Sequence, residues 1–65
     1  MSIGKNIKQI REDKGITQDE LARVLGVTSS NISQIENGDR GLNVKKADKL
    51  AQALGVTLND LMREE

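Results

Sequence analysis

Short uncharged polar side chains dominate residues 27–38, which read VTSSNISQIENG. Ile32 and Ile35 are three positions apart, which is the spacing of one face of a helix. Serine and asparagine are poor helix formers, because their side chains compete for backbone hydrogen bonds. Their hydroxyl and amide groups can read the donors and acceptors of base edges in the DNA major groove. The stretch therefore predicts a helix whose outer face carries groups that can read DNA, and the alternative is a merely solvated face.

The direction of each side chain on this helix follows from a turn of about 100° per residue. With the buried side centred between Ile32 and Ile35, the residues that point most directly outward are Ser30, Ser33, Gln34 and Asn37. Ser29 projects sideways from the N-terminus of the helix. On a helix that reads DNA, the residues placed to contact base edges would be Ser29, Ser30, Ser33 and Gln34. Gln34 is suited to a bidentate contact with adenine.

Catalytic and metal chemistry have little support in the composition. The 65 residues include no histidine and no cysteine, which excludes a thiolate metal site and the usual near-neutral proton carrier. A serine activated by a lysine is the remaining nucleophilic arrangement, but residues 29–36 contain no lysine. We expect no enzyme activity, no metal and no cofactor. With no sensor domain evident, we expect no small-molecule ligand.

Positive charge is concentrated in two segments, although ten basic residues balance ten acidic ones. Residues 1–16 and 39–50 each carry four basic and two acidic side chains. Such a distribution can present a basic face to the phosphates of double-stranded DNA. The candidate phosphate contacts in these segments are Lys5, Lys8, Arg40, Lys45 and Lys46.

No apolar run approaches the roughly 18 residues of a membrane span, and the N-terminus has no apolar signal-peptide core. We therefore expect a cytoplasmic location and no membrane partner.

A glycine, a β-branched residue and a threonine follow one another at positions 15–17, 26–28 and 55–57. Glycine can end a helix in the left-handed conformation, and threonine can cap the next helix. The middle residue can pack on an apolar residue five positions later, as in a hydrophobic staple. Apolar spacing then predicts five helices at about 3–14, 18–25, 29–36, 44–54 and 58–63. Val44 is counted with the apolar face of the fourth helix, which Asn43 could cap. The fold class is all-α, in a single domain over residues 1–65.

Only residues 26–28 separate the second and third helices, which requires a sharp crossing between them. Two helices joined by such a short turn are typical of a helix-turn-helix. We place this motif at about residues 17–37.

The run GITQDELARVLGVTSSNISQIENG, residues 15–38, resembles the helix-turn-helix of the phage-repressor and Cro type, called the Xre family. The matching positions are Thr17-Gln18, Leu21-Ala22, Gly26-Val27, Ile32-Ser33, Ile35-Glu36 and Gly38. Residues 50–62, LAQALGVTLNDLM, resemble the fourth and fifth helices of that family. The resemblance implies a compact five-helix, lambda-repressor-like DNA-binding domain. The chain departs from the family in reading Gly41-Leu42-Asn43 where a proline often precedes the fourth helix.

The resemblance also implies roles for individual residues. Gln18 would contact a phosphate and brace the recognition helix, and Asn37 would touch the DNA backbone. Thr28, Asn31 and Arg40 complete the expected phosphate contacts. Arg11 in the first helix would pair with Glu36 at the end of the third, the alternative being a weak surface pair.

A homodimer is expected, because one short recognition helix reads only a few base pairs. Two copies would read two half-sites of a palindromic operator about one helical turn apart. The expected interface is formed by Val56, Leu58, Leu61 and Met62. Val56 and Leu61 can also staple inward, and the alternative is that all four residues complete the core of the monomer.

These features predict a sequence-specific double-stranded DNA-binding transcriptional regulator. Such a protein would be a dimeric repressor or the controller of a restriction-modification system. The alternative is a protein-interaction module, such as an antitoxin or an accessory subunit that uses the same fold.

Overall fold

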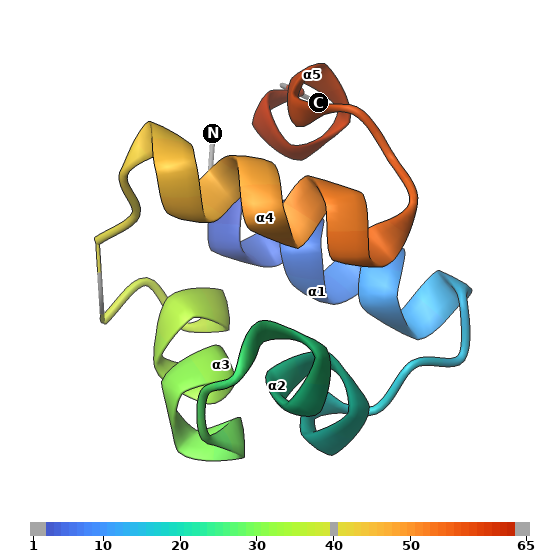
Figure 1. Ribbon diagram of the computed structural model, residues 1–65. Helices are drawn as coiled ribbons and strands as arrows, with labels where there is room; N and C mark the ends of the chain where they lie inside the picture. The colour runs from blue at the N-terminus through green and yellow to red at the C-terminus, as the bar shows by residue number, and fades with distance from the viewer. Residues whose placement is uncertain (1–2, 40, 64–65) are drawn as a thin grey trace.

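Five helices follow one another in the computed structural model, which describes residues 3–39 and 41–63. They are α1 (Ile3–Asp13), α2 (Gln18–Leu25), α3 (Ser29–Glu36), α4 (Val44–Leu54) and α5 (Leu58–Met62). The three middle helices have the predicted bounds, and α1 and α5 each end one residue earlier than predicted. In Figure 1, α2 and α3 lie on one side of α1 and α4, and α5 lies on the other. The predicted all-α fold with a helix-turn-helix is confirmed.

Three threonines cap three helices, as the repeated sequence pattern predicts. The side chains of Thr17, Thr28 and Thr57 accept the backbone N–H groups at the third positions of α2, α3 and α5. The preceding glycines are left-handed, with φ of 70°, 71° and 73°. The residues between them pack against the core, as the staple requires. Thr57 and Asp60 also form a reciprocal capping box that the sequence analysis did not anticipate.

Asn43 caps α4 as expected, because its Oδ1 accepts the N–H of Lys46 at 2.8 Å. Val44 corrects the expectation for that helix, since 74% of its surface is exposed. Ala47, Leu50, Ala51 and Leu54 form the buried face. Val44 stands roughly 70° from the centre of this face, in the first turn of the helix. Leu42, in the preceding loop, packs against the core instead.

The core is aliphatic and is shared by all five helices. Its fully buried large side chains are Ile7, Leu21, Ile32, Ile35, Leu50, Leu54 and Leu61. α1 packs against α3, α4 and α5, and α2 packs against α3 and α4. The first three helices are therefore each packed against at least two other helices.

Within residues 3–39 and 41–63, none of the helices has both the length and the apolar character needed to cross a membrane.

Candidate nucleic-acid interface

The third helix presents the polar face that the sequence predicts. Ile32, Ile35 and Glu36 are buried, whereas Ser30 and Asn37 are exposed. The other predicted base readers, Ser29, Ser33 and Gln34, are half-buried. The helix thus holds its apolar side in the core and leaves hydroxyl and amide groups along the opposite side, where base edges can be reached.

Arg11 and Glu36 form a buried ion pair between α1 and the end of α3. Nε of Arg11 lies 2.7 Å from Oε2 of Glu36, and Nη2 donates to Oε1 at 3.2 Å. The two side chains are 9% and 1% exposed, so this is not a weak surface pair. The hydrogen bonds to Glu36 raise the pKa of the Arg11 guanidinium above its ordinary value. The predicted pair is confirmed, and its two-pronged geometry fixes the orientation of α3 relative to α1.

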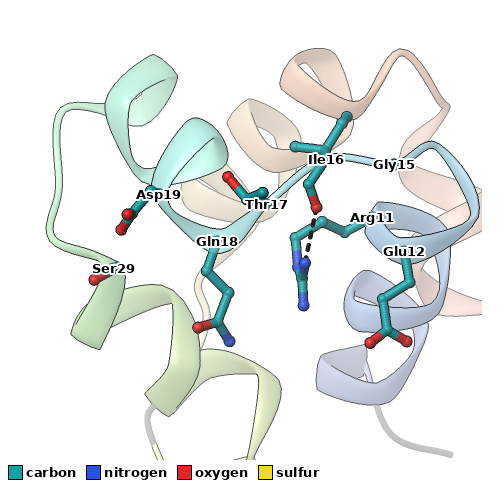
Figure 2. A pocket seen from close by; sticks show the side chains of 8 residues that line it. All are labelled: Arg11, Glu12, Gly15, Ile16, Thr17, Gln18, Asp19 and Ser29. Atoms are coloured by element: carbon teal, nitrogen blue, oxygen red, sulfur yellow. Dashed lines mark hydrogen bonds between the residues drawn. The ribbon is translucent and has the colours of Figure 1, made fainter.

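Arg11 also holds the turn between α1 and α2. Its Nη1 donates to the carbonyl oxygen of Ile16 at 2.8 Å, as the dashed line in Figure 2 shows. One guanidinium therefore connects the end of α1, the residue before the cap of α2 and the last turn of α3.

Gln18 adds a third group to this network. Its Nε2 donates to Oε1 of Glu36 at 2.9 Å, which is the brace that the family resemblance implied. An amide nitrogen carries two hydrogens, so Nε2 retains one that it can donate to an incoming oxygen. The first residue of α2 thus supports the recognition helix and still offers a donor.

Gln18 also faces a cleft of about 590 Å³ at the N-terminus of α2. The cleft is lined by Arg11, Glu12, Gly15, Ile16, Thr17, Gln18, Asp19 and Ser29 (Figure 2). Free N–H groups and the helix dipole favour an anion at such a position. Glu12 and Asp19 also line the cleft, and their carboxylates oppose an anion there by charge.

Thr28 and Asn31 lie at the start of α3. Oγ1 of Thr28 accepts the N–H of Asn31 at 3.1 Å, and the hydroxyl hydrogen remains for donation. Oδ1 of Asn31 is buried and has no hydrogen-bond partner among the described residues. An oxygen acceptor cannot bond a phosphate oxygen, so the contact predicted for Asn31 would require its amide nitrogen. Arg40, the remaining expected phosphate contact, lies outside the described residues.

The four residues of the expected dimer interface do not share one environment. Leu61 is fully buried in the core, which removes it from the predicted interface. The reason is its staple position, four residues after the cap residue Thr57. Val56 and Leu58 are half-buried, and Met62 is 48% exposed. The available apolar surface of α5 therefore consists of Met62 and part of Leu58.

Two residues of α1 that the sequence analysis missed position the neighbouring helices. Gly4 is buried against α3, where an added Cβ would collide with the carbonyl oxygens of Ile35 and Glu36. Nδ2 of Asn6 donates to the carbonyl oxygens of Leu61 and Arg63, both at 2.7 Å, and so satisfies the C-terminal end of α5. A glycine inside a predicted helix was the one available signal, because it is unfavourable there without a packing reason.

Comparison with known proteins agrees with this arrangement. Residues 7–61 match the family model described as helix-turn-helix. The chain is 39% identical over 62 residues to the transcriptional repressor RghR of Bacillus subtilis (strain 168), covering 94% of this chain and 46% of that protein. It is 35% identical over 63 residues to the antitoxin PezA of Streptococcus pneumoniae serotype 4, covering 97% and 40%. The chain therefore spans less than half the length of either relative.

Solved structures show the same fold. The clp gene regulator ClgR from Corynebacterium glutamicum superimposes with a TM-score of 0.91 at 28% identity, over 94% of this chain and 79% of that one. The biofilm regulator SinR in complex with DNA gives 0.84 at 34% identity, over 94% and 98%. The P22 c2 repressor in complex with a synthetic operator gives 0.83 at 28% identity, over 94% and 92%. The chain belongs to the helix-turn-helix family of the phage-repressor and Cro type, and its fold is lambda-repressor-like.

Proposed function

We propose that this chain binds double-stranded DNA sequence-specifically and regulates transcription as a homodimer. The observation that carries the proposal is the fixed position of α3, whose end is held by Arg11 and Gln18 through Glu36. A reading helix that is locked before binding loses little freedom on binding, which favours affinity. The similarity to a transcriptional repressor and to regulators solved with DNA supports the same function.

In this proposal, Ser29, Ser30, Ser33 and Gln34 face base edges, and Gln18, Thr28, Asn31, Asn37 and Arg40 position the DNA backbone. Asn37 is exposed at the last turn of α3, where its amide can reach a phosphate. Base edges supply the sequence information, whereas the phosphate contacts set the register of α3 in the groove. The partner is a palindromic operator, because a two-fold dimer presents two copies of α3.

Selection of bound duplexes from a random DNA pool tests the proposal. We expect an enriched palindrome whose half-sites are centred about one helical turn apart. The control is a Ser30→Glu, Ser33→Glu variant, which places two carboxylates on the reading face of a folded chain and should enrich nothing. Recovery of unrelated sequences by both proteins would contradict the proposal.

A second candidate function is the DNA-binding part of an antitoxin, which the similarity to PezA favours. It differs from the first in the protein that accompanies the chain rather than in the DNA chemistry. Co-purification of a toxin encoded beside the gene, with loss of toxicity on co-expression, would favour this candidate. A regulated promoter without such a neighbour would favour the first.

A further inference from the structure

Two adjoining depressions lie between α2 and α4. One, of about 250 Å³, is lined by Leu25, Val27, Asn43, Lys45, Lys46 and Lys49. The other, of about 350 Å³, is lined by Val24, Leu25, Lys49, Gln52 and Ala53. Because both are lined by Leu25 and Lys49, they form one continuous surface, which we call the α2–α4 groove.

The floor of the α2–α4 groove is apolar. Leu25, Val27 and Ala53 pack against the core from below and are only partly covered. Val24, on the same side of α2, is 71% exposed. Contiguous apolar surface of this kind is characteristic of an interaction site.

The rim of the α2–α4 groove is positive. Lys45, Lys46 and Lys49 line it, and no acidic residue lines either depression. The ion pairs among residues 3–39 and 41–63 are Arg11–Glu36 and Arg63–Asp60, so the three lysines are unpaired within that part of the chain. The first turn of α4 has no acidic side chain, and its dipole adds to the positive potential. The rim therefore carries an excess of positive charge, although Asp48 lies beside the groove and accepts a hydrogen bond from Gln52 at 3.1 Å.

We propose that the α2–α4 groove binds an acidic amphipathic helix of a partner protein, which carries aliphatic side chains on one face and carboxylates beside them. The lysines alone would suit DNA phosphates, as the sequence suggested for Lys45 and Lys46. A DNA backbone, however, offers only phosphates and deoxyribose rings, which cover an apolar surface formed by Val24, Leu25 and Val27 less completely than aliphatic side chains do. An aliphatic side chain would displace water from that floor while its neighbouring carboxylates meet the lysines.

This surface goes beyond the proposed DNA-binding function because its apolar floor has no part in that function, although Lys45 and Lys46 on its rim are also candidate phosphate contacts. None of the base-reading residues Ser29, Ser30, Ser33 and Gln34 lines either depression. From Lys45 to Ala53 the groove follows nine residues of α4, a rise of about 12 Å. That length accommodates about two turns of a bound helix, which is a small interface of the weak, transient kind.

The test uses the full chain labelled with ¹⁵N and two synthetic 14-residue helical peptides. The first peptide carries glutamates and leucines on adjacent faces, and the second replaces every leucine by glutamine without changing the charge. We expect the leucine peptide to shift the amide signals of Leu25, Val27, Lys46 and Lys49 in a saturable manner. The glutamine peptide should bind at least tenfold more weakly at the same ionic strength.

Matched protein variants localise the site. Lys49→Glu should weaken binding of the leucine peptide at least tenfold, whereas Lys14→Glu, an exposed position just after α1 and outside both depressions, should leave it unchanged. Circular dichroism verifies that each variant is folded, and Lys49→Gln serves if the charge reversal disrupts α4.

Several outcomes would overturn the inference. Equal binding of the two peptides would mean that the groove binds polyanions through its lysines alone, with no role for its apolar floor. Shifts caused by a random-sequence DNA duplex but not by the peptide would assign the lysines to phosphates. Shifts that appear on raising the protein concentration alone would assign the groove to a second copy of the chain, and no saturable shift at all would reject it.

Discussion

Gly4 of α1 lies so close to Glu36 of α3 that a Cβ built on it would stand 2.7 Å from the carbonyl oxygen of Glu36. The Ile35 carbonyl oxygen blocks the same space. This backbone-to-backbone approach sets how closely the first helix supports the end of the recognition helix, and neither carbonyl can move without disturbing α3.

Gly4→Ala should destabilise the fold by about 1–3 kcal/mol, because the methyl group forces α1 and α3 apart. Helix propensity alone predicts instead that Gly4→Ala stabilises the fold by about 0.5–1 kcal/mol. Urea unfolding followed by far-ultraviolet circular dichroism measures the effect, since the chain has no tryptophan or tyrosine. Gly41→Ala is the matched control, because a Cβ there meets no atom within 4 Å. Equal stability of the two variants would show that the close approach is not a constraint.

Arg11 and Glu36 should behave as a coupled pair. Arg11→Met or Glu36→Gln alone should cost about 3 kcal/mol, because each leaves a buried polar partner unsatisfied. The double variant should lose less than the sum, with an interaction energy above about 0.5 kcal/mol. A double-mutant cycle in urea measures this coupling, and additive losses would mean that the pair does not act as a unit.

Asp60 should make the stability of α5 sensitive to acid. Its carboxylate accepts the backbone N–H of Thr57, and this bond lowers the pKa of Asp60 below its ordinary value of 3.8. A carboxyl group with a lower pKa in the folded state contributes stability above its unfolded pKa and loses it as the pH falls through the folded value. Asp60→Asn should therefore flatten the fall in stability below pH 3.8. Titration of the Asp60 carboxyl carbon by NMR gives the shift directly, and a midpoint at or above 3.8 would contradict it.

Gln34 and Gln18 should affect DNA binding in different ways. Gln34→Ala should relax the base preference at one position of each half-site and cost about 1–3 kcal/mol. Gln18→Ala should weaken operator and scrambled DNA alike, because phosphate contacts position without specifying. Titrations at matched salt on both duplexes separate the two effects. A uniform loss from Gln34→Ala would remove it from the base readers, and an unchanged Gln18→Ala would remove that residue from the interface.

Met62→Glu should disrupt the proposed homodimer, because it places a charge on the exposed apolar surface of α5. Sedimentation equilibrium at micromolar concentrations should show a shift from dimer to monomer. Val44→Glu is the control, since Val44 is also apolar and exposed but lies at the start of α4. A dimer that survives Met62→Glu would move the interface elsewhere, and a wild-type monomer that still binds a half-site would refute the dimer.

The elements that the sequence predicted correctly depend on short-range chemistry. A glycine, a staple residue and a threonine cap lie within three positions, so the start of each following helix is encoded locally. Asn6 and Gly4 depend on which helix lies across from them, and their environments could not be derived from helical spacing. For Leu61 the local rule and the wider context disagreed. The hydrophobic staple predicted a buried side chain, whereas its apolar neighbours suggested a dimer interface.

Part of the candidate site could likewise be predicted from the sequence. The outward face of α3 follows from two isoleucines and the helical period. The ion pair between Arg11 and Glu36, 25 positions apart, came from the family resemblance, because no local rule connects residues at that separation. The buried oxygen of Asn31 was not foreseen from the helical period.

The first helix contacts the reading helix through Gly4 and Arg11, and it contacts α5 through Asn6. In a dimer formed through α5, α1 would therefore connect the subunit interface to the recognition helix α3 and set the distance between them. The spacing of the two half-sites on the duplex would then depend on the eleven-residue helix α1. Base preference would be set independently by side chains of α3. Spacing and sequence are then separable properties of the operator, encoded on two different helices.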